Sequence, residues 1–246
     1  MGRARALTPQ ELAQASSIGG FFALRTGRAE HPGVPLAAVY AGRTAPLTSR
    51  IDTVAARLRA PERRVAASIA HLGLAARLWS IALGPAALHG AVPDLTADRL
   101  SWDAGRSSPD DLLLAPGGEA REATVECLVE TVLEGHLAPL GEAVRRDTPV
   151  SAALLRGNAG SALAGAVREL HGWARKAGRP EVGERARALG AALFAHPALA
   201  DTGTLAFAPG PAFRRRSCCL YYRCPDGGLC GDCVFERPPR RADGPN

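Results

Sequence analysis

The sequence is almost without lysine, and it is poor in tyrosine, tryptophan and methionine. Its 246 residues include three tyrosines, three tryptophans, one methionine and a single lysine, Lys176. This shortage, beside abundant leucine and alanine, argues against a β-sandwich and favours helices. The formal charge of +6 is therefore carried almost wholly by arginine. It permits nucleic acid or an anionic membrane surface as a partner and requires neither.

No apolar run in the sequence predicts a membrane span or a secretion signal. The most apolar stretch, residues 78–92, is short and contains Pro85 and His89. The first residues lack the apolar centre of a signal peptide. We expect a cytoplasmic protein, with peripheral association at the inner face of the membrane left open. In a reducing compartment, clustered cysteines indicate metal ligands or redox groups before structural disulfides.

Two common kinds of site are also missing from the sequence. The Gly-Gly pairs at 19–20, 117–118 and 227–228 lack the strand and helix that flank a dinucleotide-binding loop. The six histidines are scattered and form no pair with each other or with cysteine. We therefore expect neither NAD(P)H binding nor a Rieske-like or zinc-hydrolase site.

Length and composition predict an α+β fold that is predominantly helical. With 246 residues, 46% of them hydrophobic, the chain can bury a full core. We predict a helical body with a few short strands over residues 1–205, a small cysteine-rich module over 206–237, and a disordered tail over 238–246.

Hydrophobic spacing and capping residues place the expected elements. Thr8 and Glu11 form a capping box that predicts a helix start, with the helix running to about residue 24. Gly84–Pro85 should end the second helix, and Pro139 should kink or split the third. The other expected helices span 48–83, 122–146, 158–177 and 180–195. Expected strands are one within 34–40, a hairpin of 100–104 with 111–115, and 204–208.

Five of the six cysteines fall within sixteen residues, 218–233. Thiolates are soft ligands that bind soft or borderline metals, so this cluster in an otherwise cysteine-poor chain indicates a metal site. The sixth, Cys127, lies in the apolar stripe of an expected helix, and we interpret it as a buried apolar side chain.

The spacing of these cysteines leaves two kinds of metal site open. Cys230 and Cys233 form the Cys-x2-Cys pair that chelates zinc through a tight turn. Cys218 and Cys219 are adjacent, and adjacent residues seldom turn both side chains toward one tetrahedral ion. A two-iron cluster offers four thiolate positions on two metals, so it accepts an adjacent pair more easily. The pattern favours iron–sulfur and leaves zinc as the alternative.

The segment 215–233 resembles the C-terminal [2Fe–2S] motif of the FhuF-type ferric siderophore reductases. That family carries Cys-Cys-x10-Cys-x2-Cys, and ten residues separate Cys219 from Cys230 here. The resemblance implies a [2Fe–2S] cluster held by Cys218, Cys219, Cys230 and Cys233.

A looser resemblance extends into the helical body. Segments 135–140 and 151–159 are similar to the helical core of the family and to a domain of siderophore synthetases. By this resemblance His136 and Asn158 are candidates for lining a substrate pocket; the alternatives are a packed histidine and an asparagine at a helix N-cap. The sequence departs from the family at two positions. Arg156 stands where the family commonly has tryptophan, so a stacking contact made by that tryptophan would be missing. Cys224 is an extra cysteine, which we interpret as a bystander.

Several neighbours of the cysteines are candidates for tuning the cluster. Arginines 214–216 and Arg223 would favour the reduced, more negative state. Tyrosines 221–222 and the amides of the Gly-Gly turn at 227–228 would donate hydrogen bonds to the sulfurs. We expect Asp232 to cap the Cys-x2-Cys turn or to face water.

The resemblance implies an oxidoreductase that reduces an iron(III) siderophore and releases iron(II) in the cytoplasm. It favours a hydroxamate siderophore, needs an external electron donor such as a ferredoxin or a flavoprotein reductase, and gives no role to nucleic acid. We expect no catalytic residue beyond the cluster, because transfer of one electron needs no acid–base pair. Two other classes are a zinc-stabilised protein that binds nucleic acid through its basic C-terminal segment, and an iron–sulfur sensor without turnover.

Overall fold

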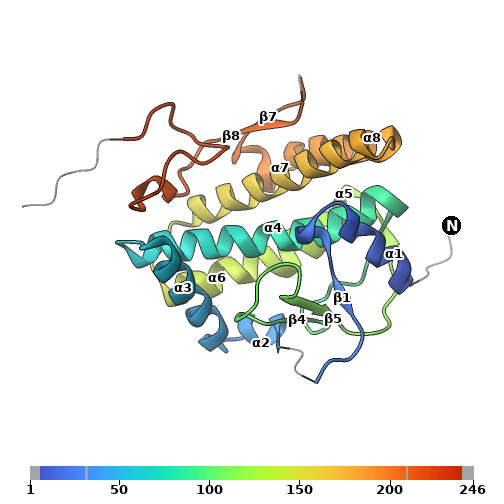
Figure 1. Ribbon diagram of the computed structural model, residues 1–246, viewed down its shortest axis with the longest axis horizontal. Helices are drawn as coiled ribbons and strands as arrows, with labels where there is room; N and C mark the ends of the chain where they lie inside the picture. Colours follow the sequence, from blue (N-terminus) through green and yellow to red (C-terminus); the bar gives the residue numbers. More distant parts are fainter. Residues whose placement is uncertain (1–5, 31–32, 209, 240–246) are drawn as a thin grey trace, which may run out of the picture.

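Helix α4 (Arg63–His89) is the centre of the fold, with the other long helices packed around it. The computed structural model describes residues 6–30, 33–208 and 210–239. Helices α3 (Ala45–Leu58), α7 (Ala152–Lys176) and α8 (Pro180–Ala195) all contact α4 (Figure 1). With 56% helix and 10% strand, the predicted α+β, mainly helical class is confirmed.

The apolar character of α4 is explained by its central position. By length and composition it is the one helix in the described part of the chain that could cross a membrane, but 78% of its most apolar window is buried inside the protein. It is longer than the apolar stretch 78–92, because the helix begins at Arg63. A helix that is apolar on nearly every side is typical of the core of a protein as well as of a membrane span.

The helix predicted over 48–83 is wrong in two respects. The chain forms two helices, α3 and α4, separated at Arg59, which adopts a left-handed conformation with φ of 47°, and at Pro61, a helix breaker that the periodicity concealed. At the other end, α4 continues through Gly84–Pro85 and stops at Gly90. A Cβ on Gly84 would lie 3.0 Å from the Phe22 ring, so the glycine allows the N-terminal segment to pack closely on α4.

The N-terminal segment begins as predicted and ends earlier. The capping box is confirmed: the Glu11 amide donates to the Thr8 hydroxyl at 3.2 Å, and the Thr8 amide donates to the Glu11 carboxylate at 2.9 Å. Helix α1 stops at Gln14 instead of residue 24, because short 3-10 turns replace it. The N-terminal elements are α1 (Pro9–Gln14), η1 (Ala15–Ser17), η2 (Gly20–Phe22), β1 (Arg25–Thr26), β2 (Val34–Pro35) and α2 (Leu36–Tyr40). The strand expected within 34–40 is therefore two residues long and turns into a helix.

The predicted hairpin is confirmed as the middle of a small sheet. Strands β4 (Leu100–Trp102) and β5 (Leu112–Leu114) are antiparallel, with Ser101 opposite Leu113. The sheet order is β1-β5-β4-β2, with β1 parallel to β5. A second pair joins β3 (Ala91–Val92) to β6 (Arg121–Glu122).

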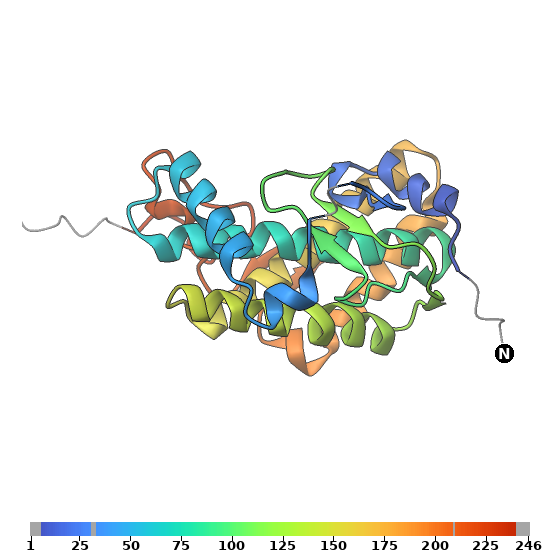
Figure 2. The ribbon, with the colours of Figure 1, turned by 90° about the horizontal axis from the view of Figure 1, so that it is seen from below.

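The helix predicted over 122–146 starts three residues later than expected, because Glu122 belongs to strand β6 and Thr124 caps the helix; from Val125 it is continuous but not uniform. It contains α5 (Val125–Leu128), the π-helix η3 (Val129–Leu137) and α6 (Ala138–Asp147), seen along the lower edge in Figure 2. The wide π turns lie immediately before Pro139, which has no amide hydrogen to donate. The predicted irregularity at this proline thus takes the form of a π segment. Cys127 is buried in the core, as expected.

The C-terminal third places the cysteines against the body. Helix α7 begins six residues before the predicted start, and α8 has the predicted bounds. After α9 (Pro197–Ala200), strands β7 (Gly203–Ala206) and β8 (Ala212–Arg215) pair antiparallel, and β8 packs on α7. The boundary predicted at residue 205 falls inside this hairpin and stays a prediction. Most of the tail predicted to be disordered, residues 240–246, lies outside the described residues.

Candidate metal centre

The structure brings together the four cysteines of the motif. They follow β8 and flank the short helix η4 (Tyr221–Arg223), beside the N-terminal end of α4. The Cys230 thiol donates a hydrogen bond to the Cys219 sulfur, and the charges of Cys230 and Cys233 both act on Cys218. Cys219 is buried and the other three are half-buried; none is in a disulfide. Their role as ligands stays a prediction.

Each of the four sulfurs accepts a hydrogen bond from the backbone amide two residues further on. The distances are 3.2 Å from Leu220 to Cys218 and 3.4 Å from Phe235 to Cys233. Tyr221 and Asp232 donate in the same way to Cys219 and Cys230. Amide donors favour a thiolate and a negatively charged cluster.

Leu220 explains how the sulfurs of two adjacent cysteines both accept amide hydrogen bonds. Its φ of 70° and ψ of 1° are left-handed, a conformation that costs a leucine about 1–3 kcal/mol. The turn directly follows the Cys218–Cys219 pair and directs two successive amides to the two sulfurs. Backbone strain of this kind is held where the surrounding structure requires it.

The protonation of the thiols is uneven. The hydrogen bond from Cys230 lowers the pKa of Cys219 to about 7 and raises the pKa of Cys230. Burial raises the pKa of Cys218. Cys219 therefore loses its proton more readily than Cys218 or Cys230, and metal binding needs thiolates.

The donor set has the chemistry that a two-iron cluster requires. In the part of the chain that the structure describes, no group of three or more histidine, cysteine or acidic side chains lies close enough together to hold a metal ion, so the fit to a cluster rests on the chemistry of the donors. A [2Fe–2S] cluster asks for two thiolates on each iron. Four thiols with one amide donor each meet that requirement in kind and number.

Arg215 is the positive charge that faces the thiols. It is 2% exposed, and its charge acts on Cys218, Cys219 and Cys230. Its Nε donates to the Ser217 carbonyl at 2.9 Å. Its two neighbours in the basic run point outward: Arg214 pairs with Glu236, and Arg216 is exposed. All three arginines of the run 214–216 were expected to act on the cluster. Only Arg215 faces the thiols, because side chains along β8 point alternately inward and outward.

Asn158 holds Arg215 and the cysteine segment against the body. It lies inside α7, fully buried, and its Oδ1 accepts from Arg215 Nη2 at 2.6 Å. Its Nδ2 donates to the Ser68 carbonyl at 2.9 Å, and the Ser68 hydroxyl donates to the Cys219 carbonyl at 2.8 Å. The N-cap interpretation of Asn158 is wrong, because Ser151 is the N-cap of α7. Asn158 positions the centre rather than lining a pocket.

His136 is a packed histidine. Its Nε2 is 2.6 Å from the Leu95 carbonyl and its Nδ1 is 3.0 Å from the Tyr40 hydroxyl. Burial lowers the pKa of His136 to about 4. The cavity that it lines has a volume of about 170 Å³, below the range of roughly 300–1,000 Å³ that is typical of ligand pockets.

Other expected tuning groups have different partners. Asp232 is buried and accepts from Ser161 and, at 3.1 Å, from Arg168, so it anchors the module and does not face water. The Gly227 amide donates to the Cys224 carbonyl at 3.0 Å and not to a sulfur. Arg223 forms an ion pair with Glu62. The sulfur donors are instead backbone amides, which a sequence motif does not reveal.

Replacing Gly157 with alanine is expected to loosen the cysteine segment from α7. A Cβ at this position would clash with the Ser217 hydroxyl and lie 3.2 Å from Arg215 Nη2. We expect a loss of about 1–3 kcal/mol in unfolding free energy, as for other overpacked sites, together with lower iron content.

Gly165→Ala is the matched control for Gly157→Ala in the same helix. The nearest atom to its added Cβ, on Arg168, is 4.0 Å away, so the change should stabilise the helix by about 0.5–1 kcal/mol. Thermal unfolding and iron analysis compare the two variants. Equal iron content and stability in both would contradict this account of Gly157.

Fold and site together define a mainly helical protein with a C-terminal iron–sulfur centre. Residues 215–235 match the FhuF 2Fe-2S C-terminal domain. This match confirms the resemblance seen in the motif, is consistent with the FhuF-type family, and indicates a [2Fe–2S] cluster. The match covers the cysteine segment and not the helical body. A comparison of the whole chain with curated proteins finds no match.

Proposed function

We propose that this protein is a ferric siderophore reductase that acts in the cytoplasm. Its substrate is an iron(III) siderophore, and one electron converts the iron to iron(II). Iron(III) is a hard cation held tightly by anionic oxygen donors, whereas iron(II) is less charged and is held more weakly by the same chelator. Reduction therefore releases the iron.

The observation that carries the proposal is the set of four thiols, each with an amide donor, beside a buried arginine. We propose Cys218, Cys219, Cys230 and Cys233 as the ligands. When bound, a [2Fe–2S] cluster accepts and donates electrons one at a time. The amides and Arg215 stabilise added negative charge, and Leu220 holds the adjacent pair in place.

The exposure of the cysteines suits exchange with other molecules. Cys218, Cys230 and Cys233 are only half-buried, so the centre reaches the protein surface on one side. An external donor, a ferredoxin or a flavoprotein reductase, would deliver the electron there. The residues outside the cysteine segment would bind the chelate and exclude water. Transfer of a single electron requires no proton transfer.

Anaerobic purification followed by single-turnover reduction tests the function. We expect a coloured protein with iron and labile sulfide, and an EPR signal after reduction with dithionite. Mixed with an iron(III) trihydroxamate and an iron(II)-trapping dye, the reduced protein should yield one iron(II) per cluster. A colourless protein with stoichiometric zinc would support the zinc alternative instead. A coloured protein that does not speed iron release would be a sensor.

A further inference from the structure

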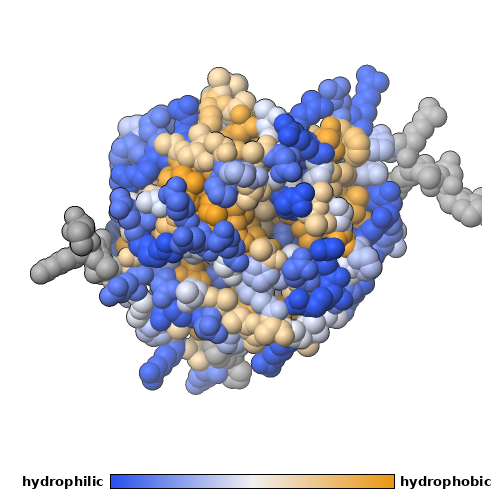
Figure 3. Space-filling view, turned by 180° about the vertical axis from the view of Figure 1, so that it is seen from behind, coloured by the Kyte–Doolittle hydropathy of each residue, from blue (hydrophilic) through white to orange (hydrophobic). Residues whose placement is uncertain are grey.

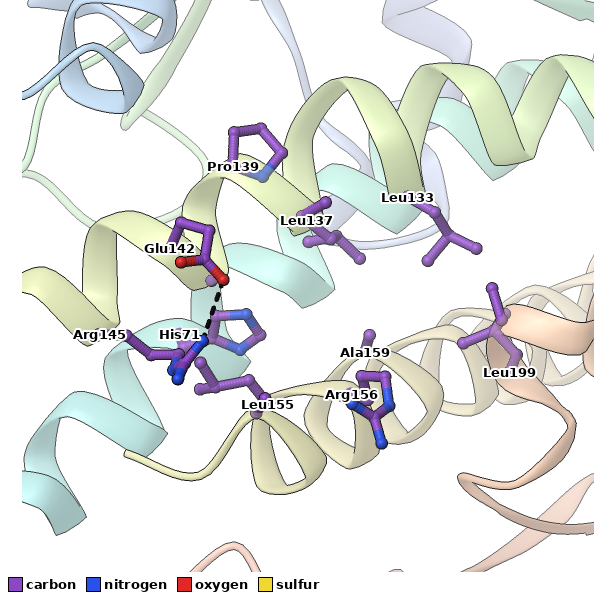
Figure 4. Close-up of a pocket in the computed structure, with 14 residues that line it drawn as sticks. His71, Leu133, Leu137, Pro139, Glu142, Arg145, Leu155, Arg156, Ala159 and Leu199 are labelled. Carbon is purple, nitrogen blue, oxygen red and sulfur yellow. Dashed lines mark hydrogen bonds and ion pairs between the residues drawn. The ribbon is translucent and has the colours of Figure 1, made fainter. Parts of the chain in front are cut away.

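A pocket of about 430 Å³ lies between α7 and the helix formed by η3 and α6 (Figure 4). Its volume is within the range of roughly 300–1,000 Å³ that is typical of ligand pockets. Part of its wall is the π segment, a rare element found mostly at functional sites. The wall is largely apolar and includes Leu133, Leu137, Pro139, Leu155, Ala159 and Leu199.

One buried polar group in this pocket has no partner. His71, from α4, is among the lining residues and is 1% exposed. Its Nδ1 has no hydrogen-bond partner among the described residues. Burial lowers the pKa of His71 to about 4, so the imidazole is neutral at pH 7. A buried polar atom without a partner costs about 1–3 kcal/mol, and a bound ligand would supply the missing hydrogen bond.

The charges around the pocket are nearly balanced. Arg145 pairs with Glu142 at 3.1 Å, and Arg156 lies 3.9 Å from Asp201. Glu142, Arg145 and Arg156 line the pocket and are exposed, so they form its rim, and Asp201 is an exposed neighbour of Arg156 outside the lining. Figure 3 shows the opposite side of the molecule from Figure 1, with apolar side chains gathered between charged ones. Apolar walls, a neutral histidine and a balanced rim suit a ligand without net charge.

Helix α7 separates this pocket from the cysteine segment. Leu155 and Ala159 line the pocket, whereas Gly157 and Asn158 face Ser217 and Arg215. The pocket and the side of α7 that contacts Ser217 and Arg215 are thus about one helix diameter apart, on the order of 10 Å.

His71 links the two sides. It lines the pocket, and the positive charge of Arg215 acts on it. The same arginine that faces the thiols therefore also acts electrostatically on a residue of the pocket wall.

We propose that this pocket binds the iron(III) chelate, and that it takes a chelate with no net charge. This inference rests on the proposed function. Three hydroxamate groups neutralise iron(III), whereas three catecholates leave three negative charges, for which the rim has no matching excess of cations. One electron from an external ferredoxin or flavoprotein would convert the bound iron(III) to iron(II), and a cluster held by Cys218, Cys219, Cys230 and Cys233 would supply the one-electron chemistry between them.

Binding is measured with gallium(III) complexes, which have the charge of the iron(III) complexes but are not reduced. The holoprotein is titrated by calorimetry with the gallium trihydroxamate complex. Ala198→Trp places an indole at an exposed position that lines the pocket, and Ala138→Trp does so on the opposite wall. We expect each to weaken binding by about tenfold or more, because a filled pocket cannot bury the ligand. Ala200→Trp, exposed in the same helix α9 and outside the pocket, is the matched control.

The outcomes separate the pocket from the proposed function. If both tryptophan variants in the pocket bind the complex as Ala200→Trp does, or if the gallium tris-catecholate binds as tightly as the trihydroxamate, the assignment is overturned. If iron(III) trihydroxamate is reduced with an unchanged KM by Ala198→Trp and Ala138→Trp, the pocket fails while the function stands. Binding that the indoles block, without any reduction by the wild type, supports the pocket and refutes the reductase.

Discussion

Cys230→Ala should yield a folded, colourless protein that no longer reduces iron(III) siderophores. The change removes one of the four proposed ligands and the hydrogen bond to Cys219. Loss of a residue that only hydrogen-bonds to a metal ligand costs about 10–100-fold in metal affinity or activity. Loss of a ligand itself should cost more. Visible absorption, EPR after dithionite and iron analysis measure the cluster, and dye-trapped iron(II) measures the reduction.

Cys224→Ala is the control for this variant within the same module. Cys224 is buried and lies outside the proposed ligand set, so we expect its variant to keep the chromophore and the reduction rate. Thermal unfolding shows whether both variants retain the helical body. Retention of the chromophore by Cys230→Ala and its loss from Cys224→Ala would show that the ligand set is wrong.

Arg215→Gln should make the cluster harder to reduce. Removing a buried positive charge beside the thiols withdraws stabilisation from the reduced state. At an effective dielectric constant near 20 a neighbouring unit charge is worth about 1–3 kcal/mol, which is about 40–130 mV for a one-electron couple. The potential falls, because the electron is no longer attracted by the arginine. An EPR-monitored redox titration measures the shift.

Two variants separate the charge of Arg215 from its structural contacts. Arg215→Lys keeps the charge but cannot reproduce the bonds to Ser217 and Asn158. It should lower thermal stability while shifting the potential less than Arg215→Gln does. Arg214→Gln, exposed and paired with Glu236, should leave the potential nearly unchanged. If all three variants gave the same shift, the electrostatic role of Arg215 would be refuted.

The chemistry of the centre was predictable from the sequence because its thiols lie close together along the chain. The cysteines lie within sixteen residues, and their spacing favours two irons over one ion wherever the segment packs. The bounds of α8 are also local, because Pro180 is suited to the first turn of a helix and Pro197 follows soon after its last residue, Ala195. A strand period of two would also have placed Arg215 on the buried face with Phe213.

Other features depend on contacts between distant segments. Local rules end a helix at Gly84–Pro85, but burial of α4 and the close approach of Phe22 carry it to His89. No local pattern indicates that Asn158, in the middle of a helix, bridges Ser68 and Arg215.

The sequence by itself determined the kind of centre, the mainly helical class and most of the helices, since these depend on neighbouring residues. Tertiary structure alone decided which amides bond to the thiols, how Asn158 holds Arg215 beside them, and where the pocket lined by His71 lies. The physical reason is that charge, hydrogen bonding and burial act through space, between groups that can lie far apart in the chain, as Ser68 and Cys219 do at a separation of 151 residues.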